Sequence, residues 1–175
     1  GLGDVYKRQY PDETISQLSP QECTKLKREG LYICMIKNPN PVAKNVTPQL
    51  SDAAFIREKV PMTKEEIRHV SICKLHLKSD SVLYDVGSGT GSIAVEAASL
   101  SDDMEVYAIE QKENAVQLIT QNKEKHGLEN IRVINAKAPD GMENFPVPTH
   151  AFIGGSSGNL KEIIESLKAK NPHIR

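Results

Sequence analysis

The chain has 175 residues, a length that suits one domain and leaves room for a fragment of a second. Charged residues make up 26% of it and the formal net charge is −1, so overall charge gives no support to nucleic-acid or membrane binding. No apolar run approaches the roughly 18 residues that a membrane-spanning helix needs, and no signal peptide is visible, so we expect a cytoplasmic protein.

The cysteines and histidines form no cluster that would suggest a metal or disulfide site. Cys23, Cys34 and Cys73 are far apart and include no C-x-x-C pair, a usage typical of reduced thiols. The five histidines are equally dispersed. We therefore expect no bound metal and no disulfide.

Residues 1–50 offer little from which a core could be built. A short helix fits residues 20–27 and a strand fits residues 31–36, but proline, asparagine and lysine dominate from residue 38 onward. We expect a tail and linker over residues 1–50 and a separate domain over residues 51–175.

A helix is expected to begin just after Thr63. Thr63 and Glu66 have the spacing of a capping box, with Thr63 as the N-cap residue. Apolar and small residues then recur every three to four positions, which predicts the buried face of this helix: Ile67, Val70, Ser71, Cys73 and Leu77.

From residue 81 onward, β-type runs alternate with helix-prone segments. This alternation predicts an α/β fold with a parallel sheet. The chain stops where a fifth strand would begin, so we expect a sheet truncated after the fourth strand and its helix. The predicted strands are residues 81–86, 104–109, 131–136 and 150–155, and the predicted helices are residues 93–98, 114–126 and 160–170.

The sequence Tyr84-Asp85-Val86-Gly87-Ser88-Gly89-Thr90-Gly91 ends the first predicted strand and leads into a helix. Its alternating glycines permit a tight turn that brings backbone close to a ligand, and the helix behind them offers free N–H groups. No lysine follows Gly91, which excludes a P-loop, and the third glycine comes one place too early for the dinucleotide pattern G-x-G-x-x-G. An ordinary strand-to-helix turn is the simplest alternative.

The pattern D-x-G-x-G-x-G resembles motif I of the class I S-adenosylmethionine-dependent methyltransferases. In that family an acidic residue at the end of the second strand binds the cofactor ribose, and Glu110 stands at this place. A carboxylate suits the task because it accepts hydrogen bonds from two adjacent hydroxyls. The resemblance implies a Rossmann-like fold and S-adenosylmethionine as the cofactor.

Three further stretches narrow the resemblance. The three stretches are Val60-Pro61-Met62-Thr63-Lys64, Ala136-Lys137-Ala138-Pro139 and Phe152-Ile153-Gly154-Gly155-Ser156-Ser157-Gly158. Together they look like the decarboxylating precorrin methyltransferases of the CbiT type, which are similar to the C-terminal half of fused CobL. The resemblance implies methylation of a precorrin or cobalt-precorrin tetrapyrrole at carbon 15, a meso carbon. It also implies coupled decarboxylation of an acetate side chain, in cobalamin biosynthesis, by a homo-oligomer without nucleic-acid or membrane partners.

The first part of the chain fits the same family context. The two segments concerned are Tyr10-Pro11-Asp12-Glu13 and residues 31–36. They resemble the tail of a CbiE-type tetrapyrrole methylase, which methylates carbon 5 in fused proteins. This implies that the methyltransferase domain is fused to, or paired with, such a methylase.

The resemblance also carries a set of cofactor-binding residues onto this chain. Simpler explanations stay open for three of them, since Thr63 suits a helix cap, Asp85 suits a cap of the glycine turn, and Ala138 suits a plain strand exit. The full set is Thr63, Asp85, Gly87, Ser88, Gly89, Thr90, Gly91, Glu110 and Ala138.

The substrate implied by the resemblance carries several carboxylates. Basic residues just before the glycine loop would suit such a polyanion, although a solvated helix start is the alternative. The stretch Gly154–Gly158 lies at the end of the fourth predicted strand, on the ligand side of such sheets, and is expected to flank the methyl acceptor. Gly154, Gly155 and Ser156 are its preferred substrate contacts. The basic residues are Arg57, Lys59, Lys64 and Arg68, of which Arg57 and Lys64 are the preferred substrate contacts.

The sequence points to no catalytic base. Methyl transfer from a sulfonium needs none, because the cofactor carries the reactive group. Two other interpretations stay open: a class I methyltransferase acting on tRNA or protein, and a cofactor-binding but inactive fragment. The absence of tryptophan and the net charge of −1 argue against RNA.

Overall fold

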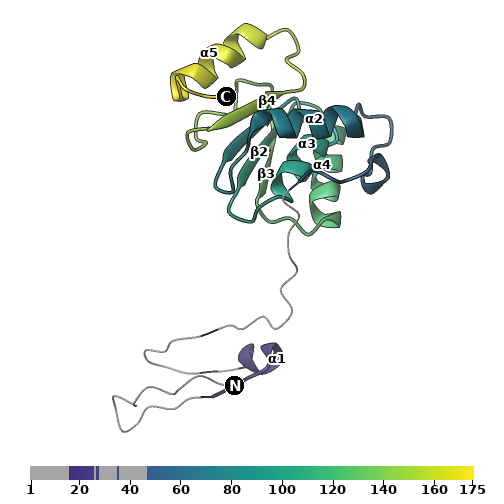
Figure 1. The fold of residues 1–175 in the computed structure, drawn as a ribbon, viewed down its shortest axis with the longest axis vertical. Coiled ribbons are helices and arrows are strands. Elements are labelled where there is room, and N and C mark those ends of the chain that lie inside the picture. Colours follow the sequence, from purple (N-terminus) through teal and green to yellow (C-terminus); the bar gives the residue numbers. More distant parts are fainter. Residues whose placement is uncertain (1–15, 26, 28–34, 36–46) are drawn as a thin grey trace. The chain divides into compact units, whose positions relative to one another are not determined.

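The computed structural model describes residues 16–25, 27, 35 and 47–175 (Figure 1). The chain divides into two compact units, Gly1–Pro41 and Val42–Arg175. In the first unit the described residues include one short helix, α1 (Pro20–Cys23), where a helix was expected. Residues 10–13, and residues 31–36 apart from Met35, lie outside the described residues, so the resemblance to a CbiE-type tail stays a prediction.

Four parallel strands form the centre of the second unit, as the alternating pattern predicts. They are β1 (Val82–Val86), β2 (Glu105–Glu110), β3 (Ile131–Asn135) and β4 (His150–Ile153). Their order in the sheet is β3-β2-β1-β4, and all three neighbouring pairs are parallel. The strand order reverses at β1, and open α/β sheets bind ligands in the crevice that such a reversal creates at the carboxyl ends of the strands.

Helices cover both faces of this sheet. Three of them, α2 (Glu65–Leu75), α3 (Ser92–Ala98) and α4 (Glu113–Lys125), lie on one face, and α5 (Leu160–Lys170) lies on the other (Figure 1). Because successive strand residues point to opposite faces, each strand contributes side chains to two hydrophobic cores, one on each face of the sheet. Leu83 packs into the core under α3 and α4, whereas Tyr84 packs into the core under α5.

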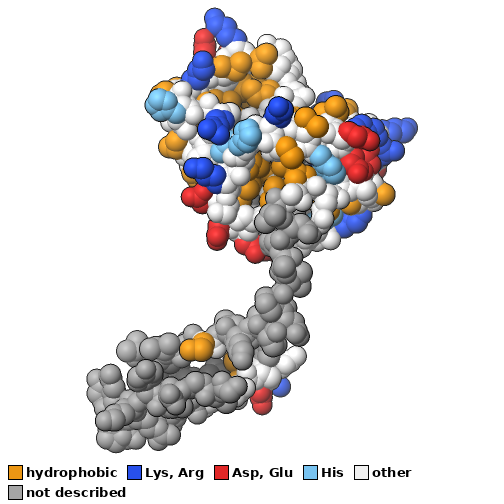
Figure 2. Space-filling model, in the orientation of Figure 1, with side chains coloured by type: hydrophobic (Ala, Val, Ile, Leu, Met, Phe, Trp, Pro, Cys, Tyr) orange, Lys and Arg blue, Asp and Glu red, His pale blue; other side chains and the backbone are white. Residues whose placement is uncertain are grey.

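The sequence pattern predicts the wrong buried face and the wrong cap for α2. Ile67 and Val70 are 62% and 57% exposed, whereas Arg68 and Ile72 are buried. Hydrophobic side chains are accordingly visible on the surface around this helix (Figure 2). The N-cap residue is Lys64 rather than Thr63, and no side chain caps this end. The spacing of apolar residues predicted the wrong face of α2 because a buried arginine, Arg68, occupies a core position.

The end of the chain lies beside β4. The N–H of Ala151 donates to the carbonyl of Arg175 at 2.8 Å, and the N–H of Arg175 donates to the carbonyl of Thr149 at 3.2 Å. This alternating pattern is that of a parallel ladder. Residues 173–175 therefore approach the place where a fifth strand was expected. No helix in the described part of the chain combines the length and hydropathy of a membrane span.

Candidate functional site

A cavity of about 360 Å³ lies at the carboxyl ends of the strands. Its volume is in the range of sites that bind small molecules. Five stretches of the chain contribute most of its wall: Val60–Thr63 before α2, Asp85–Gly89 at the end of β1, Ile109–Lys112 at the end of β2, Ala136–Ala138 after β3, and Gly154–Ser157 after β4. The strand ends thus bring residues together that are far apart in the sequence.

Most of the residues expected at the cofactor line this one cavity. They are Thr63, Asp85, Gly87, Ser88, Gly89, Glu110 and Ala138. Thr90 and Gly91 belong to the same loop but not to the cavity wall. Thr90 is fully buried, and Gly91 is the N-cap residue of α3. The loop turns away from the cavity at this point because α3 begins behind it.

The three glycines of the loop are explained by packing within the protein. Gly87, Gly89 and Gly91 all have positive φ angles, of 69°, 60° and 78°. A Cβ atom on Gly87 would lie 2.4 Å from the carbonyl oxygen of Gly155, and one on Gly89 would lie 2.8 Å from that of Pro61. Glycine is therefore required at both places even without a ligand.

Glu110 holds the glycine loop from the end of β2. One carboxylate oxygen, Oε2, accepts the N–H of Gly89 at 3.0 Å. The other, Oε1, accepts the N–H of Lys112 at 3.0 Å. Glu110 is only 8% exposed and lines the cavity. Each oxygen keeps a second lone pair, so the group can still accept hydrogen bonds from a bound molecule.

Asp85 places a buried carboxylate at the cavity wall with one oxygen unused. Its Oδ2 accepts the hydroxyl of Ser88 at 2.6 Å. Its Oδ1 is buried and has no hydrogen-bond partner among the described residues. Burial raises the pKa of Asp85 to about 6, and Glu110 adds to the rise. The Ser88 hydroxyl opposes it, and so does the nearby N–H of Ala94, which does not reach full hydrogen-bond geometry with the carboxylate. An unpaired buried acceptor of this kind suits a cationic donor on a ligand.

We expect Asp85→Asn to stabilise the ligand-free protein at pH 8. The pKa of Asp85 rises from 3.8 to about 6 on folding, so the stability linked to its neutral form is present below 3.8 and lost as pH rises through about 6. Asparagine avoids this loss, worth up to about 3 kcal/mol. The advantage should shrink as pH falls towards 4, and thermal unfolding between pH 4 and 8 measures it.

The matched control is Asp80→Asn, at an exposed aspartate just before β1. This substitution should leave the pH dependence of unfolding close to that of the unchanged protein. An Asp85→Asn variant that is less stable than the unchanged protein at pH 8 would contradict the burial of a charged carboxylate whose Oδ1 has no hydrogen-bond partner in the described part of the chain.

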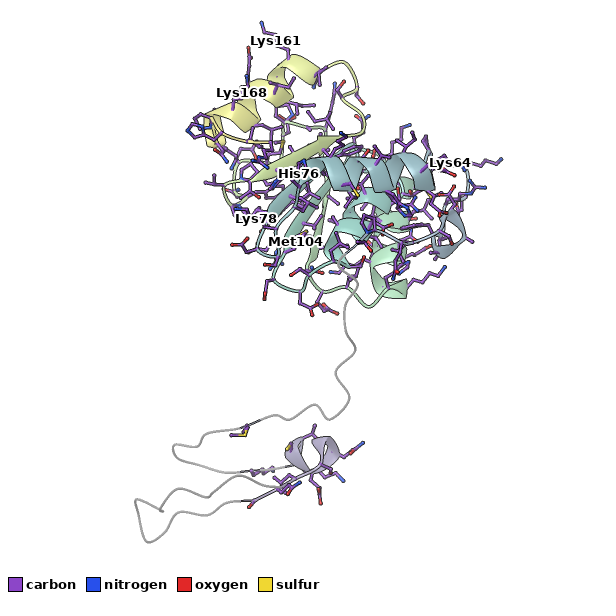
Figure 3. All side chains as sticks on the ribbon, viewed as in Figure 1. Lys64, His76, Lys78, Met104, Lys161 and Lys168 are labelled. Carbon is purple, nitrogen blue, oxygen red and sulfur yellow. The ribbon has the colours of Figure 1, made fainter. Side chains whose placement is uncertain are left out.

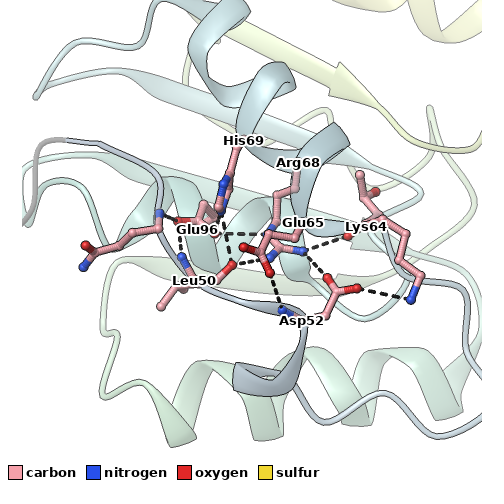
Figure 4. A network of polar contacts seen from close by, with 9 residues as sticks. Leu50, Asp52, Lys64, Glu65, Arg68, His69 and Glu96 are labelled. Carbon is pink, nitrogen blue, oxygen red and sulfur yellow. Dashed lines mark hydrogen bonds and ion pairs between the residues drawn. The ribbon is translucent and has the colours of Figure 1, made fainter.

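The basic residues expected at the substrate do not line the cavity. Lys64 points outward from the start of α2 (Figure 3), is 57% exposed and pairs with Asp52 at 3.2 Å. Arg57 is exposed. Arg68 is fully buried, and its Nε atom lies 3.0 Å from Oε2 of Glu96 (Figure 4). The prediction that Arg68 meets a substrate is therefore wrong, because its charge is already paired inside the protein.

The glycine-rich loop after β4 does reach the cavity. Gly154, Gly155 and Ser156 all line it, as expected. Ser157 belongs to the predicted stretch as well, and the amide of Gln111, which was not predicted, donates to its hydroxyl at 2.6 Å. This bond joins the loops after β2 and β4. The sequence signal that could have identified Gln111 is its place directly after β2.

The comparisons with known proteins identify precorrin methyltransferases as relatives of this chain. Residues 53–175 match the family model described as the precorrin methyltransferase domain. The chain is similar to a curated protein of Pyrobaculum calidifontis named probable cobalt-precorrin-6B C(15)-methyltransferase (decarboxylating), with 41% identity over 123 residues. That match covers 69% of this chain and 63% of the relative, so the chain spans less than two thirds of the relative's length.

Two solved structures are similar in fold and sequence. The precorrin-6y C5,15-methyltransferase of Geobacter metallireducens matches with a TM-score of 0.68 and 34% identity, covering 73% of this chain and 68% of that one. A precorrin 8W decarboxylase of Methanobacterium thermoautotrophicum matches with a TM-score of 0.67 and 32% identity, covering 72% of this chain and 69% of that one.

Proposed function

The chain belongs to the precorrin methyltransferase domain family, and from this premise we propose that it methylates a precorrin-type tetrapyrrole with S-adenosylmethionine. The observation that carries the proposal is the meeting of Asp85, Glu110 and Ala138 at one cavity. These residues come from the ends of three different strands.

The hydrogen-bond acceptors and apolar residues at the cavity fit S-adenosylmethionine. The unpaired Oδ1 of Asp85 suits the ammonium group of the methionine part, because a buried carboxylate oxygen favours a cationic donor. Glu110 has free lone pairs for the two ribose hydroxyls. Ile109 and Ala138 offer an apolar wall for the adenine. The cofactor supplies an activated methyl group, and the protein supplies its orientation and the exclusion of water.

The acceptor in this proposal is a meso carbon of the tetrapyrrole, and an acetate side chain loses CO₂ in the same overall conversion. Gly154, Gly155 and Ser156 would flank the acceptor, since they line the cavity on the β4 side, away from β2 and β3. Arg57 and Lys64 would meet peripheral carboxylates of the substrate from outside the cavity. No side chain is required as a base, because the conjugated macrocycle can hold the electrons that decarboxylation releases.

The wider organisation is part of the proposal. The family match begins at residue 53, which supports a methyltransferase domain over residues 51–175 preceded by a tail and linker. The name of the Geobacter protein combines two methylation positions, which supports a CbiE-type partner in the same or a second chain. We further propose that the protein is a cytoplasmic homo-oligomer.

Two measurements test the proposed function in sequence. Calorimetric titration with S-adenosylmethionine should show binding. Incubation with methyl-labelled cofactor and a precorrin should then show label in the tetrapyrrole and release of CO₂. Binding without transfer to any precorrin would overturn the proposed substrate and leave a different methyl acceptor, whereas absence of binding would overturn the proposed cofactor.

We expect Glu110→Gln to weaken the affinity for S-adenosylmethionine by about tenfold to a hundredfold, because a neutral amide accepts ribose hydroxyls less well than a carboxylate. Titration calorimetry measures the change. Glu113→Gln is the control, since Glu113 is exposed three residues further along and should leave the affinity unchanged. Equal affinities for S-adenosylmethionine in both variants would show that Glu110 does not bind the cofactor.

A further inference from the structure

The segment before α2 forms one wall of the cavity. We call residues 49–63 the strap. Its last residues, Val60–Thr63, line the cavity, and the Pro61 carbonyl rests against Gly89, where a Cβ atom would come within 2.8 Å of it. The gap between the strap and the glycine loop therefore sets the width of the cavity on this side.

Side chains from the helices hold the strap in place, because it contains little regular structure apart from a short 3₁₀ turn, Asp52–Ala54. Glu96 on α3 accepts the N–H groups of Gln49 and Leu50 at 2.8 and 3.2 Å. Arg68 on α2 donates to the carbonyl of Leu50 and, at 2.8 Å, to that of Thr63 (Figure 4). These contacts fix the two ends of the strap.

Asn122 on α4 fixes the middle of the strap and the glycine loop at the same time. Its Oδ1 accepts the N–H of Ile56 at 2.7 Å, and its Nδ2 donates to the carbonyl of Ile56 at 2.8 Å. The same Nδ2 donates to the carbonyl of Thr90 at 2.9 Å. The side chain is completely buried. One buried amide thus joins the strap to the glycine loop, at residues that do not themselves line the cavity.

Ile119 strengthens this connection from the same face of α4, three residues before Asn122. A Cβ atom on Gly91 would lie 3.0 Å from Cγ2 of Ile119, so α4 packs directly against the end of the glycine loop. Residues three apart on a helix share a face. The position of α4 therefore determines where both the loop and the strap lie.

We propose that Asn122 is a positioning residue for the cofactor cavity: it holds the strap and the glycine loop at the separation that binding requires. The inference rests on the proposed use of S-adenosylmethionine. Without the Asn122 amide, the Ile56 N–H and the carbonyls of Ile56 and Thr90 lose their common partner, and the strap samples other positions. Affinity falls in proportion to the fraction of molecules whose cavity is formed.

Asn130→Ala provides a matched control for Asn122→Ala. Asn130 precedes β3, and its Nδ2 donates to three carbonyls, those of Ala98, Ser101 and Met104, at 3.1, 2.9 and 3.0 Å. These partners belong neither to the strap nor to the glycine loop. Both variants remove a side-chain amide that bonds several backbone groups, but only one of them touches the strap.

The experiment combines hydrogen–deuterium exchange on the ligand-free protein with calorimetric titration of S-adenosylmethionine, at a temperature where every variant is folded. Asn122→Ala should raise exchange selectively in peptides covering residues 47–63 and weaken affinity by at least about tenfold. Asn130→Ala should lower the unfolding temperature but leave strap exchange and affinity unchanged. If Asn122→Ala does not fold, Asn122→Asp replaces it, since it keeps the acceptor for the Ile56 N–H and loses both donated bonds.

Unchanged strap exchange in the Asn122 variant, or an equal loss of affinity in Asn130→Ala, would overturn the positioning role. If the unchanged protein does not bind S-adenosylmethionine, the proposed function fails. The exchange measurement still decides whether Asn122 holds the strap, because it is made without ligand.

Discussion

Replacing Arg68 by methionine should lower the free energy of unfolding by about 3–5 kcal/mol, because breaking a buried ion pair leaves an uncompensated charge. Arg68 is completely buried and Glu96 is 1% exposed, with 3.0 Å between Nε and Oε2. The substitution also removes the donors for the carbonyls of Leu50 and Thr63. Urea denaturation followed by circular dichroism measures the loss.

Two further variants show whether the buried charge is the cause. Arg57→Met removes an exposed arginine from the strap and should change stability by no more than about 0.5 kcal/mol. The double variant Arg68→Met with Glu96→Gln should be more stable than Arg68→Met alone. Glutamine removes the unpaired charge and keeps an oxygen for the N–H groups of Gln49 and Leu50. A loss below about 1 kcal/mol for Arg68→Met would show that the pair is not buried in solution.

The same ion pair explains where the sequence prediction of the fold succeeded and where it failed. The strands were predictable because each is a short β-type run between turn residues, and β2 and β3 lie within one residue of their expected bounds. Helix α4 was predictable from its apolar face and from Gly127 just beyond its end. The buried face of α2 was not, since it depends on Glu96, a partner 28 residues from Arg68.

The candidate site shows a similar division. Asp85, Glu110 and Gly155 could be predicted to share a cavity because each lies at or just beyond the carboxyl end of a strand, and parallel strands bring these ends to one edge. Gln111 obeys the same rule, since it comes directly after β2, although it was not predicted. Pro61 could not be assigned to the cavity wall in this way. The place of Pro61 is set by the contacts of the strap with α2, α3 and α4, and such tertiary contacts leave no periodic trace in the sequence.

Gly155→Val should leave the fold and cofactor binding nearly intact while lowering turnover by about a hundredfold. Gly155 does not have a positive φ angle, and a Cβ atom there would meet nothing within 4 Å, so the fold can accept a side chain. The residue lines the cavity on the β4 side, whereas Glu110 and Ala138 lie on the β2 and β3 side. The added methyl groups therefore reduce the space for the methyl acceptor rather than for the ribose and adenine.

Gly87→Val is the informative contrast, because its Cβ atom would lie 2.4 Å from the Gly155 carbonyl oxygen and its φ angle is +69°. This variant should lose stability together with every activity, whereas Gly155→Val should keep its unfolding temperature and its affinity for S-adenosylmethionine. Thermal unfolding, calorimetric titration and single-turnover methyl transfer separate the three quantities. Normal turnover by a Gly155→Val protein would show that the loop after β4 does not flank the methyl acceptor. Loss of cofactor affinity would show that Gly155 lies at the cofactor instead.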